Sequence, residues 1–250
     1  MSTSKDPTAC VLIIGNEILS GRTKDVNLNF IANRLTELGI RLSEARVIPD
    51  LSHVIVDTVN QCRAGYDYVF TTGGIGPTHD DITSESVSKA FELKYEIHKE
   101  AYKILEKYYG TNDFNEGRQR MSWMPSKANL ILNPASGAPG FYVENVFCLP
   151  GVPSILESML PSLTNKIVGG EPILSKTISL RTLESEIAKP LKQVQEKNND
   201  VDIGSYPFFK KGKIGVSIVL TSRDQSKIDK CNSQILVFIK EKKIEIVDRD

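Results

Sequence analysis

Residues 71–83 read TTGGIGPTHDDIT, and this stretch decides how the rest of the chain is interpreted. It continues a short apolar run, Tyr68–Thr72, whose aromatic and β-branched residues predict a β-strand. The glycines that follow let the backbone turn and leave its N–H groups open to an anion. A helix is predicted to begin near Thr83, and its N-terminus adds the positive end of the helix dipole. A strand, a glycine turn and a helix in this order predict a phosphate-binding loop in an α/β fold.

Strand and helix patterns alternate around this stretch as far as about residue 165. The unbroken apolar run Ala9–Ile14 is typical of a central parallel strand, which is buried on both faces. Further strands are predicted at Leu42–Ile48 and Val143–Leu149. Helical apolar spacing is found in Leu28–Leu38, Leu51–Gly65, Val87–Phe91, Ala101–Tyr108 and Leu156–Leu163. The alternation predicts a doubly wound, mostly parallel α/β sheet with helices on both faces.

The pattern changes after Gly169-Gly170-Glu171-Pro172, which is the best linker candidate in the chain. The predicted elements beyond it are strands at Lys176–Leu180, Val201–Ser205, Ile214–Thr221 and Ile244–Val247, and helices over Glu184–Lys197 and Ile228–Phe238. Their order is β-α-β-β-α-β, a split βαβ plan. We therefore expect a first domain at 1–168 and a second, smaller α+β domain at 169–250.

Composition excludes several classes of function. Lys and Arg total 31 and so do Asp and Glu, so the formal net charge is zero, which argues against binding to nucleic acid or to a membrane surface. No apolar run approaches the roughly 18 residues of a membrane span, and no signal-peptide pattern opens the sequence, so we expect a cytoplasmic protein. Four scattered cysteines and three histidines lack the spacing of a zinc site. We expect no zinc, haem or flavin as a bound cofactor.

Asp80 and Asp81 are adjacent carboxylates just before the helix predicted from Thr83. One acid there could simply cap the helix. Two acids beside a phosphate loop repel each other and the ligand unless a positive charge lies between them. A divalent cation bound by carboxylate and phosphate oxygens would supply that charge, so we favour a metal held by Asp80 and Asp81 over capping alone. For His79 we favour the interpretation of an ordinary surface residue.

Other turns rich in small residues fall near the same predicted sheet edge. Ligands of α/β sheets bind at the carboxyl ends of the strands, so the convergence of these turns predicts a pocket. An ordinary connection remains the alternative for each turn taken alone, and helix capping for Asn27. The expected ligand-binding residues are Glu17, Asn27, Thr72, Gly73, Gly74, Gly76, Pro77, Thr78, Thr83, Gly137, Gly140, Pro150 and Gly151, with Asp50 completing the polar wall.

Four segments together resemble a known family. They are GNEILSG at 15–21, TGGIGPTHDDIT at 72–83, GAPGF at 137–141 and LPGVP at 149–153. In this order they resemble the molybdopterin-binding (MoaB/Mog-like) superfamily, and most closely the amino-terminal domain of CinA proteins and the matching domain of FAD synthases. The resemblance covers essentially the whole chain, because GSYP at 204–207 is similar to the small second domain of FAD synthases.

The resemblance implies a metal-dependent hydrolase of phosphoanhydride bonds in nucleotides such as ADP-ribose or FAD, with Mg²⁺ or Co²⁺ and K⁺ as the associated ions. Asp81 matches an aspartate that is functional in the related adenylyltransferases. Those enzymes carry a basic residue immediately before it, whereas this chain carries Asp80, which favours hydrolysis over adenylyl transfer. Asn16 stands where this branch commonly has an aspartate, so a ligand role at that loop falls on Glu17.

Three hypotheses about function follow. The first is a nucleotide pyrophosphohydrolase with Asp81, Asp80 and Asp50 as catalytic residues and a divalent metal at Asp80 and Asp81. The second is a molybdopterin-binding or adenylating protein of molybdenum-cofactor biosynthesis. The third is a non-catalytic nucleotide-binding module. In each case the partner is a small nucleotide or pterin, with no nucleic acid and no membrane, and the relatives suggest self-association into a homo-oligomer.

Overall fold

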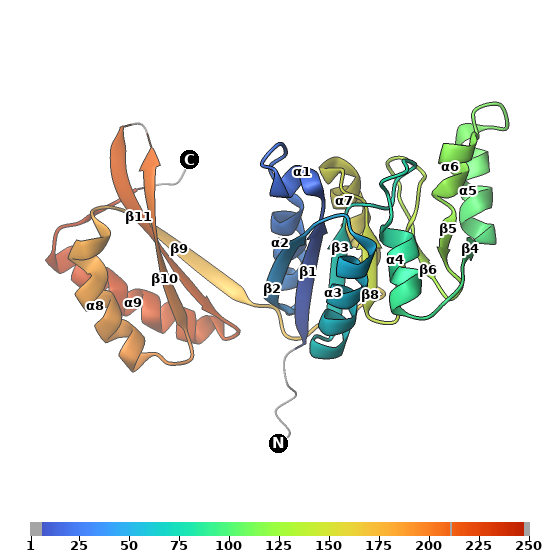
Figure 1. Cartoon of the computed structure of the whole chain (residues 1–250). Helices are drawn as coiled ribbons and strands as arrows, with labels where there is room; N and C mark the ends of the chain where they lie inside the picture. Colours follow the sequence, from blue (N-terminus) through green and yellow to red (C-terminus); the bar gives the residue numbers. More distant parts are fainter. Residues whose placement is uncertain (1–6, 211, 248–250) are drawn as a thin grey trace, which may run out of the picture. The chain divides into compact units, whose positions relative to one another are not determined.

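The structure of the chain is a computed structural model that describes residues 7–210 and 212–247. The chain divides into two compact units, Met1–Gly170 and Glu171–Asp250, which are coloured blue to yellow and orange to red in Figure 1. The division falls inside the segment expected as a linker, two residues after the expected boundary. The glycine pair Gly169-Gly170 is attached to the first unit, because the N–H of Gly170 donates to the carbonyl of Leu38 at 3.0 Å.

The first unit alternates strands and helices as the sequence pattern predicts. Its elements are β1 (Thr8–Ile14), α1 (Asn16–Leu19), α2 (Asn27–Glu37), β2 (Arg41–Ile48), α3 (Ser52–Gly65), β3 (Tyr68–Thr72), α4 (Thr83–Ala90), β4 (Tyr95–Ile97), α5 (Lys99–Tyr109), α6 (Glu116–Arg120), β5 (Trp123–Pro125), β6 (Asn129–Ile131), β7 (Gly140–Val143), β8 (Val146–Leu149), α7 (Pro153–Met159) and the 3-10 helix η1 (Leu160–Leu163). The strands of the main sheet follow the order β2-β1-β3-β8-β7-β6. The first four are parallel and β7 is antiparallel to both neighbours, so the mostly parallel sheet is confirmed.

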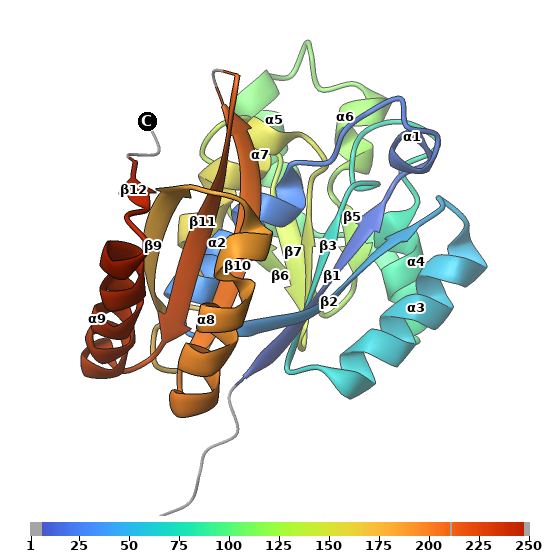
Figure 2. The ribbon, with the colours of Figure 1, turned by 90° about the vertical axis from the view of Figure 1, so that its left-hand side faces the viewer.

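Alternate residues of β1 supply two separate cores. Cys10, Leu12 and Ile14 belong to the core that contains the buried side chains of α3 and α4. Ala9, Val11 and Ile13 belong to the core on the other face, with α2 and α7. Figure 2 shows α2 on one side of the sheet and α3 and α4 on the other. Both faces of β1 are covered, which explains why its sequence is an unbroken apolar run.

One predicted strand is in fact two. Val143–Leu149 was expected as a single strand, but Val143 ends β7 and β8 begins only at Val146. Glu144, with φ at 50°, and Asn145 form the turn between them. The Asn145 side chain donates to the carbonyls of Arg63 and Tyr66, both at 3.0 Å, and so ties the turn to the end of α3. The polar pair Glu144-Asn145 interrupts the apolar residues on either side, and it is the sequence signal that could have marked this reversal.

The second unit has the predicted β-α-β-β-α-β order. Its elements are β9 (Leu174–Arg181), α8 (Glu184–Lys197), β10 (Asp202–Lys210), β11 (Lys213–Ser222), α9 (Gln225–Glu241) and β12 (Glu245–Ile246). The sheet order is β10-β11-β9-β12, and every neighbouring pair is antiparallel. Apolar side chains of α8 and α9 pack with those of the sheet in one core. The smaller α+β unit is therefore confirmed. Within the described residues, no helix is both long and apolar enough to cross a bilayer.

Pro190 lies inside α8, where a proline removes the N–H that would bond the carbonyl four residues earlier. That carbonyl belongs to Glu186, and the Lys242 ammonium, just past the end of α9, donates to it at 2.9 Å. The Lys242 side chain thus supplies the donor that α8 lacks at Pro190.

We predict that Lys242→Ala lowers the free energy of unfolding by about 0.5–1 kcal/mol, because this exposed hydrogen bond is lost. In a Pro190→Ala background the helix supplies its own donor, so the same substitution costs almost nothing. A double-mutant cycle in urea measures the difference, with Lys240→Ala, which removes an equal charge nearby, as the control. Equal costs in both backgrounds would contradict this account.

Candidate functional site

The glycine loop after β3 begins with Gly73, where the surrounding backbone leaves no space for a side chain. Gly73 has φ at 95°, and a Cβ there would lie 2.3 Å from the carbonyl oxygen of Ile14 in β1. Its N–H donates to the carbonyl of Leu149 in β8 at 3.1 Å. Gly73 therefore joins the loop to the ends of β1 and β8. Its N–H is already used, so it does not cradle a phosphate as the sequence suggested.

The next three residues hold the free donors. In the described part of the chain, the N–H groups of Gly74, Ile75 and Gly76 form no hydrogen bond. Gly74 has φ at 68°, and a Cβ on it would lie 2.2 Å from the Thr83 hydroxyl oxygen. The N–H of Thr83 donates to the carbonyl of Gly74 at 2.9 Å. Thr83 is fully buried against the loop, where it fixes the loop's shape.

Asp81 lies against the last glycine of the loop. Its Oδ2 accepts the Thr78 N–H at 2.8 Å and the Thr78 hydroxyl at 2.5 Å. A Cβ on Gly76 would lie 2.7 Å from the same oxygen, so the glycine leaves space for the carboxylate. Oδ1 accepts no hydrogen bond from the described residues. One oxygen thus orients Asp81, and the other is left for a ligand.

Asp80 has a different environment from its neighbour. It is exposed and does not line the cavity described below. The neighbouring Thr78 has the largest effect in lowering the pKa of Asp80, followed by a backbone N–H and the charges of His79 and Arg120. Asp80 and Asp81 therefore differ in exposure, and only Asp81 lines the cavity.

A cavity of about 580 Å³ opens beside this loop at the carboxyl ends of β3 and β8. Its size is within the range of small-molecule sites. The residues that line it are Glu17, Gly73, Gly74, Ile75, Gly76, Pro77, Asp81, Tyr109, Arg118, Met121, Asn133, Ser136, Ala138, Pro139, Pro150, Gly151, Val152 and Ile155. The cavity therefore gathers the loop after β1, the glycine loop and the turn after β8, as the position of α/β ligand sites predicts.

A small hollow of about 60 Å³ adjoins the cavity and holds two more of the expected residues, Asn27 and Thr72. Glu17, Gly73 and Gly151 line both spaces. The Asn27 amide donates to the carbonyl of Gly151 at 2.8 Å, while its buried Oδ1 has no partner. Asn27 thus holds the turn after β8 with one end of its side chain and offers an unused acceptor with the other.

Several expected site residues lie outside the cavity. Asp50 accepts the N–H of Asn16 at 2.8 Å and so fixes the loop after β1. Gly137, with φ at 73°, makes room for the Tyr108 ring, and a Cβ on Gly140 would lie 2.5 Å from the carbonyl oxygen of Cys148. These three residues contact neighbouring backbone or a ring and do not line the cavity themselves. The others outside the lining are Asp80, Thr78 and Thr83, whose contacts are described above.

The sequence did not reveal the residues on the far side of the loop, which include Tyr109, Arg118, Met121 and Asn133. The Asn133 side chain holds its own wall together: its amide donates to Ser136 and Ala138, and its Oδ1 accepts two backbone N–H groups. The Asn-Pro pair at 133–134 is a turn signal that could have marked this loop. Nothing in the pattern around Arg118 distinguishes it from a solvent-exposed arginine.

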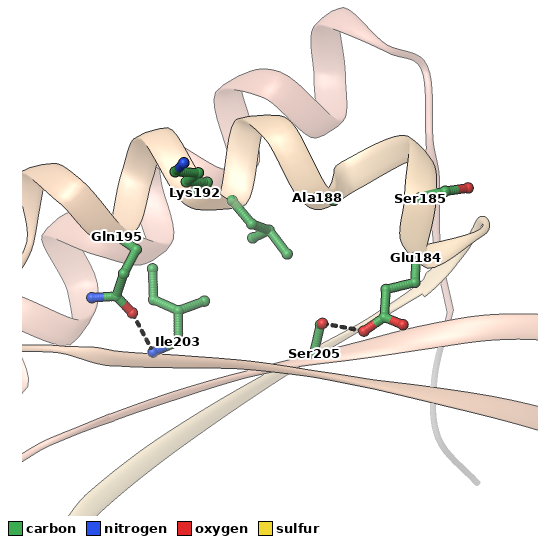
Figure 3. Close-up of a pocket in the computed structure, with 8 residues that line it drawn as sticks. Glu184, Ser185, Ala188, Lys192, Gln195, Ile203 and Ser205 are labelled. Atoms are coloured by element: carbon green, nitrogen blue, oxygen red, sulfur yellow. Dashed lines mark hydrogen bonds between the residues drawn. The ribbon is translucent and has the colours of Figure 1, made fainter.

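A second cavity lies in the second unit, between α8 and β10 (Figure 3). Two of its polar contacts are internal, because Ser205 donates to Glu184 and the Ile203 N–H donates to Gln195 at 2.9 Å. Among the described residues, this cavity contains no glycine loop and does not lie at the carboxyl ends of parallel strands. The cavity of the first unit is therefore the candidate functional site.

Comparison with known proteins matches each unit to a family. Residues 10–170 match the family described as "Probable molybdopterin binding domain". The chain belongs to the molybdopterin-binding domain family. Residues 172–248, the second unit, match the "FAD synthase, middle domain". The resemblance inferred from the four sequence motifs is confirmed in both halves.

Individual relatives cover the chain almost from end to end. A protein of Archaeoglobus fulgidus is 34% identical over 233 residues, which are 93% of this chain and 98% of that one. One from Sulfurisphaera tokodaii is 32% identical over 245 residues, 92% and 93% of the two chains. A solved structure of CinA from Thermoplasma acidophilum, described as of unknown function, is 34% identical with a TM-score of 0.61. It covers 64% of this chain and 98% of its own.

We predict that Gly76→Ala weakens ligand binding while the protein stays folded. The new methyl group meets the Asp81 carboxylate at 2.7 Å and must displace it, although the backbone angles at Gly76 suit an alanine. Gly65→Ala is the matched control, because a Cβ there meets nothing within 4 Å. Titration calorimetry with ADP-ribose, together with thermal unfolding, measures both effects. Wild-type affinity in Gly76→Ala would show that the Asp81 position does not matter.

Proposed function

We propose that this chain binds a nucleotide through its phosphoanhydride group in the first-unit cavity and hydrolyses that group with the help of a divalent cation. One observation carries the proposal: the glycine loop with its free N–H groups, the oriented Asp81 and Arg118 all line a single cavity. Backbone N–H groups and an arginine are the usual partners of phosphate oxygens.

The cavity has a polar and an apolar part, which suits a nucleotide. The N–H groups of Gly74 to Gly76 would bind phosphate oxygens at one side. Met121, Ala138, Pro139, Val152 and Ile155 supply an apolar wall on which a planar base or flavin ring could rest. ADP-ribose and FAD both join such a ring to a diphosphate, and we propose them as the substrate class.

A divalent cation fits this site only if the substrate completes its coordination. Among residues 7–210 and 212–247, no three His, Cys, Asp or Glu side chains gather as metal ligands. Mg²⁺, however, is commonly held by one or two carboxylates together with phosphate oxygens and water. Asp81, through its free Oδ1, and Glu17 are the carboxylates that line the cavity. We propose these two as the ligands in place of the Asp80–Asp81 pair.

Each part of the chain then has a separate task. A bound Mg²⁺ or Co²⁺ would neutralise phosphate charge and lower the pKa of a water molecule. Thr78 keeps Asp81 in position through two hydrogen bonds. The glycine loop orients the diphosphate, and the apolar wall excludes water from the base. A supporting role for K⁺ and a cytoplasmic location remain part of this proposal.

A second candidate function is the binding of a pterin without hydrolysis. The family match to a molybdopterin-binding domain favours it. The same apolar wall would hold the pterin ring. A pterin retained through purification and identified by its fluorescence would support this candidate. Binding of ADP-ribose without its hydrolysis would instead support a non-catalytic nucleotide-binding function.

We predict that Asp81→Asn lowers the turnover of ADP-ribose or FAD by about a hundredfold or more, because the group that faces the cavity loses its charge. The asparagine keeps the acceptor for Thr78, so the thermal midpoint stays close to wild type. Asp80→Asn is the matched control, since it removes the same charge one residue away but outside the cavity, and it should retain most activity.

Product chromatography with Mg²⁺ and with Co²⁺ provides the measurement. Equal losses in the two variants would contradict the separate roles assigned to these carboxylates. If the wild-type protein cleaves neither nucleotide with either ion, the hydrolase proposal is wrong and the binding functions take its place.

A further inference from the structure

The short helix α6 lies beside the glycine loop. A Cβ on Gly117 would lie 3.4 Å from the carbonyl oxygen of Pro77, the residue that follows the loop, which is van der Waals contact. The next residue, Arg118, lines the cavity on this side. The contact between Gly117 and Pro77 thus brings a positive charge to the phosphate loop from a distant part of the sequence.

The Arg118 side chain is held by the protein before any ligand arrives. Its Cζ lies 4.2 Å from the centre of the Tyr109 ring, and its Nη1 donates to the carbonyl of Asp113. Tyr109 in turn packs edge-on against Tyr108, whose ring occupies the space left by Gly137. Because an arginine on an aromatic face loses little further freedom when it binds, this arrangement suits recognition of an anion.

Arg118 is the only cationic residue among those that line the cavity, which also contains the carboxylates of Glu17 and Asp81. It forms no ion pair with any carboxylate of the described residues. A guanidinium has five N–H donors, and the contact with Asp113 uses one Nη. The remaining donors are available to a bidentate oxyanion such as a diphosphate.

We propose that Arg118 is a substrate-binding residue that donates hydrogen bonds to the diphosphate opposite the N–H groups of Gly74 to Gly76. It selects ligands that contain a phosphoanhydride over nucleosides that lack one. The inference rests on the proposed function for its substrate class, but it concerns binding and does not depend on turnover. Tyr109 supports this role by holding the guanidinium in place.

Titration calorimetry with three probes tests the proposal: the α,β-methylene analogue of ADP-ribose, inorganic pyrophosphate and adenosine. Arg118→Gln should raise the Kd of both phosphate probes about tenfold to a hundredfold and leave adenosine unchanged. Arg118→Lys should recover only part of the loss, because a lysine keeps the charge without the fork of donors. Tyr109→Leu should weaken the same two probes to a smaller extent.

Arg41→Gln is the control, since it removes an equal charge from an exposed residue at the start of β2, away from the cavity. Wild-type affinity of Arg118→Gln for the phosphate probes, or an equal loss for adenosine, would overturn the proposal. So would a wild-type protein that binds neither phosphate probe.

The proposal and the hydrolase function can fail separately. Arg118-dependent binding of pyrophosphate without hydrolysis would support the role of Arg118 and reject the hydrolase. Hydrolysis whose KM is unchanged in Arg118→Gln would support the hydrolase and reject the role of Arg118.

Discussion

The close approach of Gly73 to β1 is the constraint on which the candidate site depends. With a carbonyl oxygen of β1 only 2.3 Å from the position of a Cβ, no other residue fits there without moving a central strand. The same glycine donates to β8, so the loop is fixed by two strands of the sheet. This anchoring gives the three following N–H groups a rigid base. The loop therefore owes its shape to the sheet and not to its own flexibility.

Charge around the loop is arranged differently from what the sequence suggests. Two adjacent aspartates imply a cation between them, but the structure separates their surroundings. Thr78 donates two hydrogen bonds to Asp81, which lines the cavity, whereas Asp80 is exposed and lies outside it. The helix α6 carries Arg118, which also lines the cavity. The case for a metal rests on Asp81, Glu17 and the substrate together.

Sequence periodicity predicted both units and the order of their main elements, because each long helix or strand buries one face against a core. It predicted the loop residues of the site for the same reason, since they follow strands that are easily recognised. It missed β4, β5 and α6, which are too short to show a period, and so it missed Arg118. It also assigned Asp50, Gly137 and Gly140 to the ligand, although their contacts are with neighbouring backbone or rings. A single sequence indicates that a glycine or an acid in a loop has a specific role, but it does not show which groups that residue contacts.

The most direct test of the account is a crystal structure with the α,β-methylene analogue of ADP-ribose, which has the diphosphate geometry but is not cleaved. We expect the diphosphate in the first-unit cavity, within hydrogen-bond distance of the N–H groups of Gly74 to Gly76, with Asp81 beside it. A diphosphate bound in the groove between α8 and β10, or one in the first-unit cavity that makes no contact with the glycine loop, would contradict it.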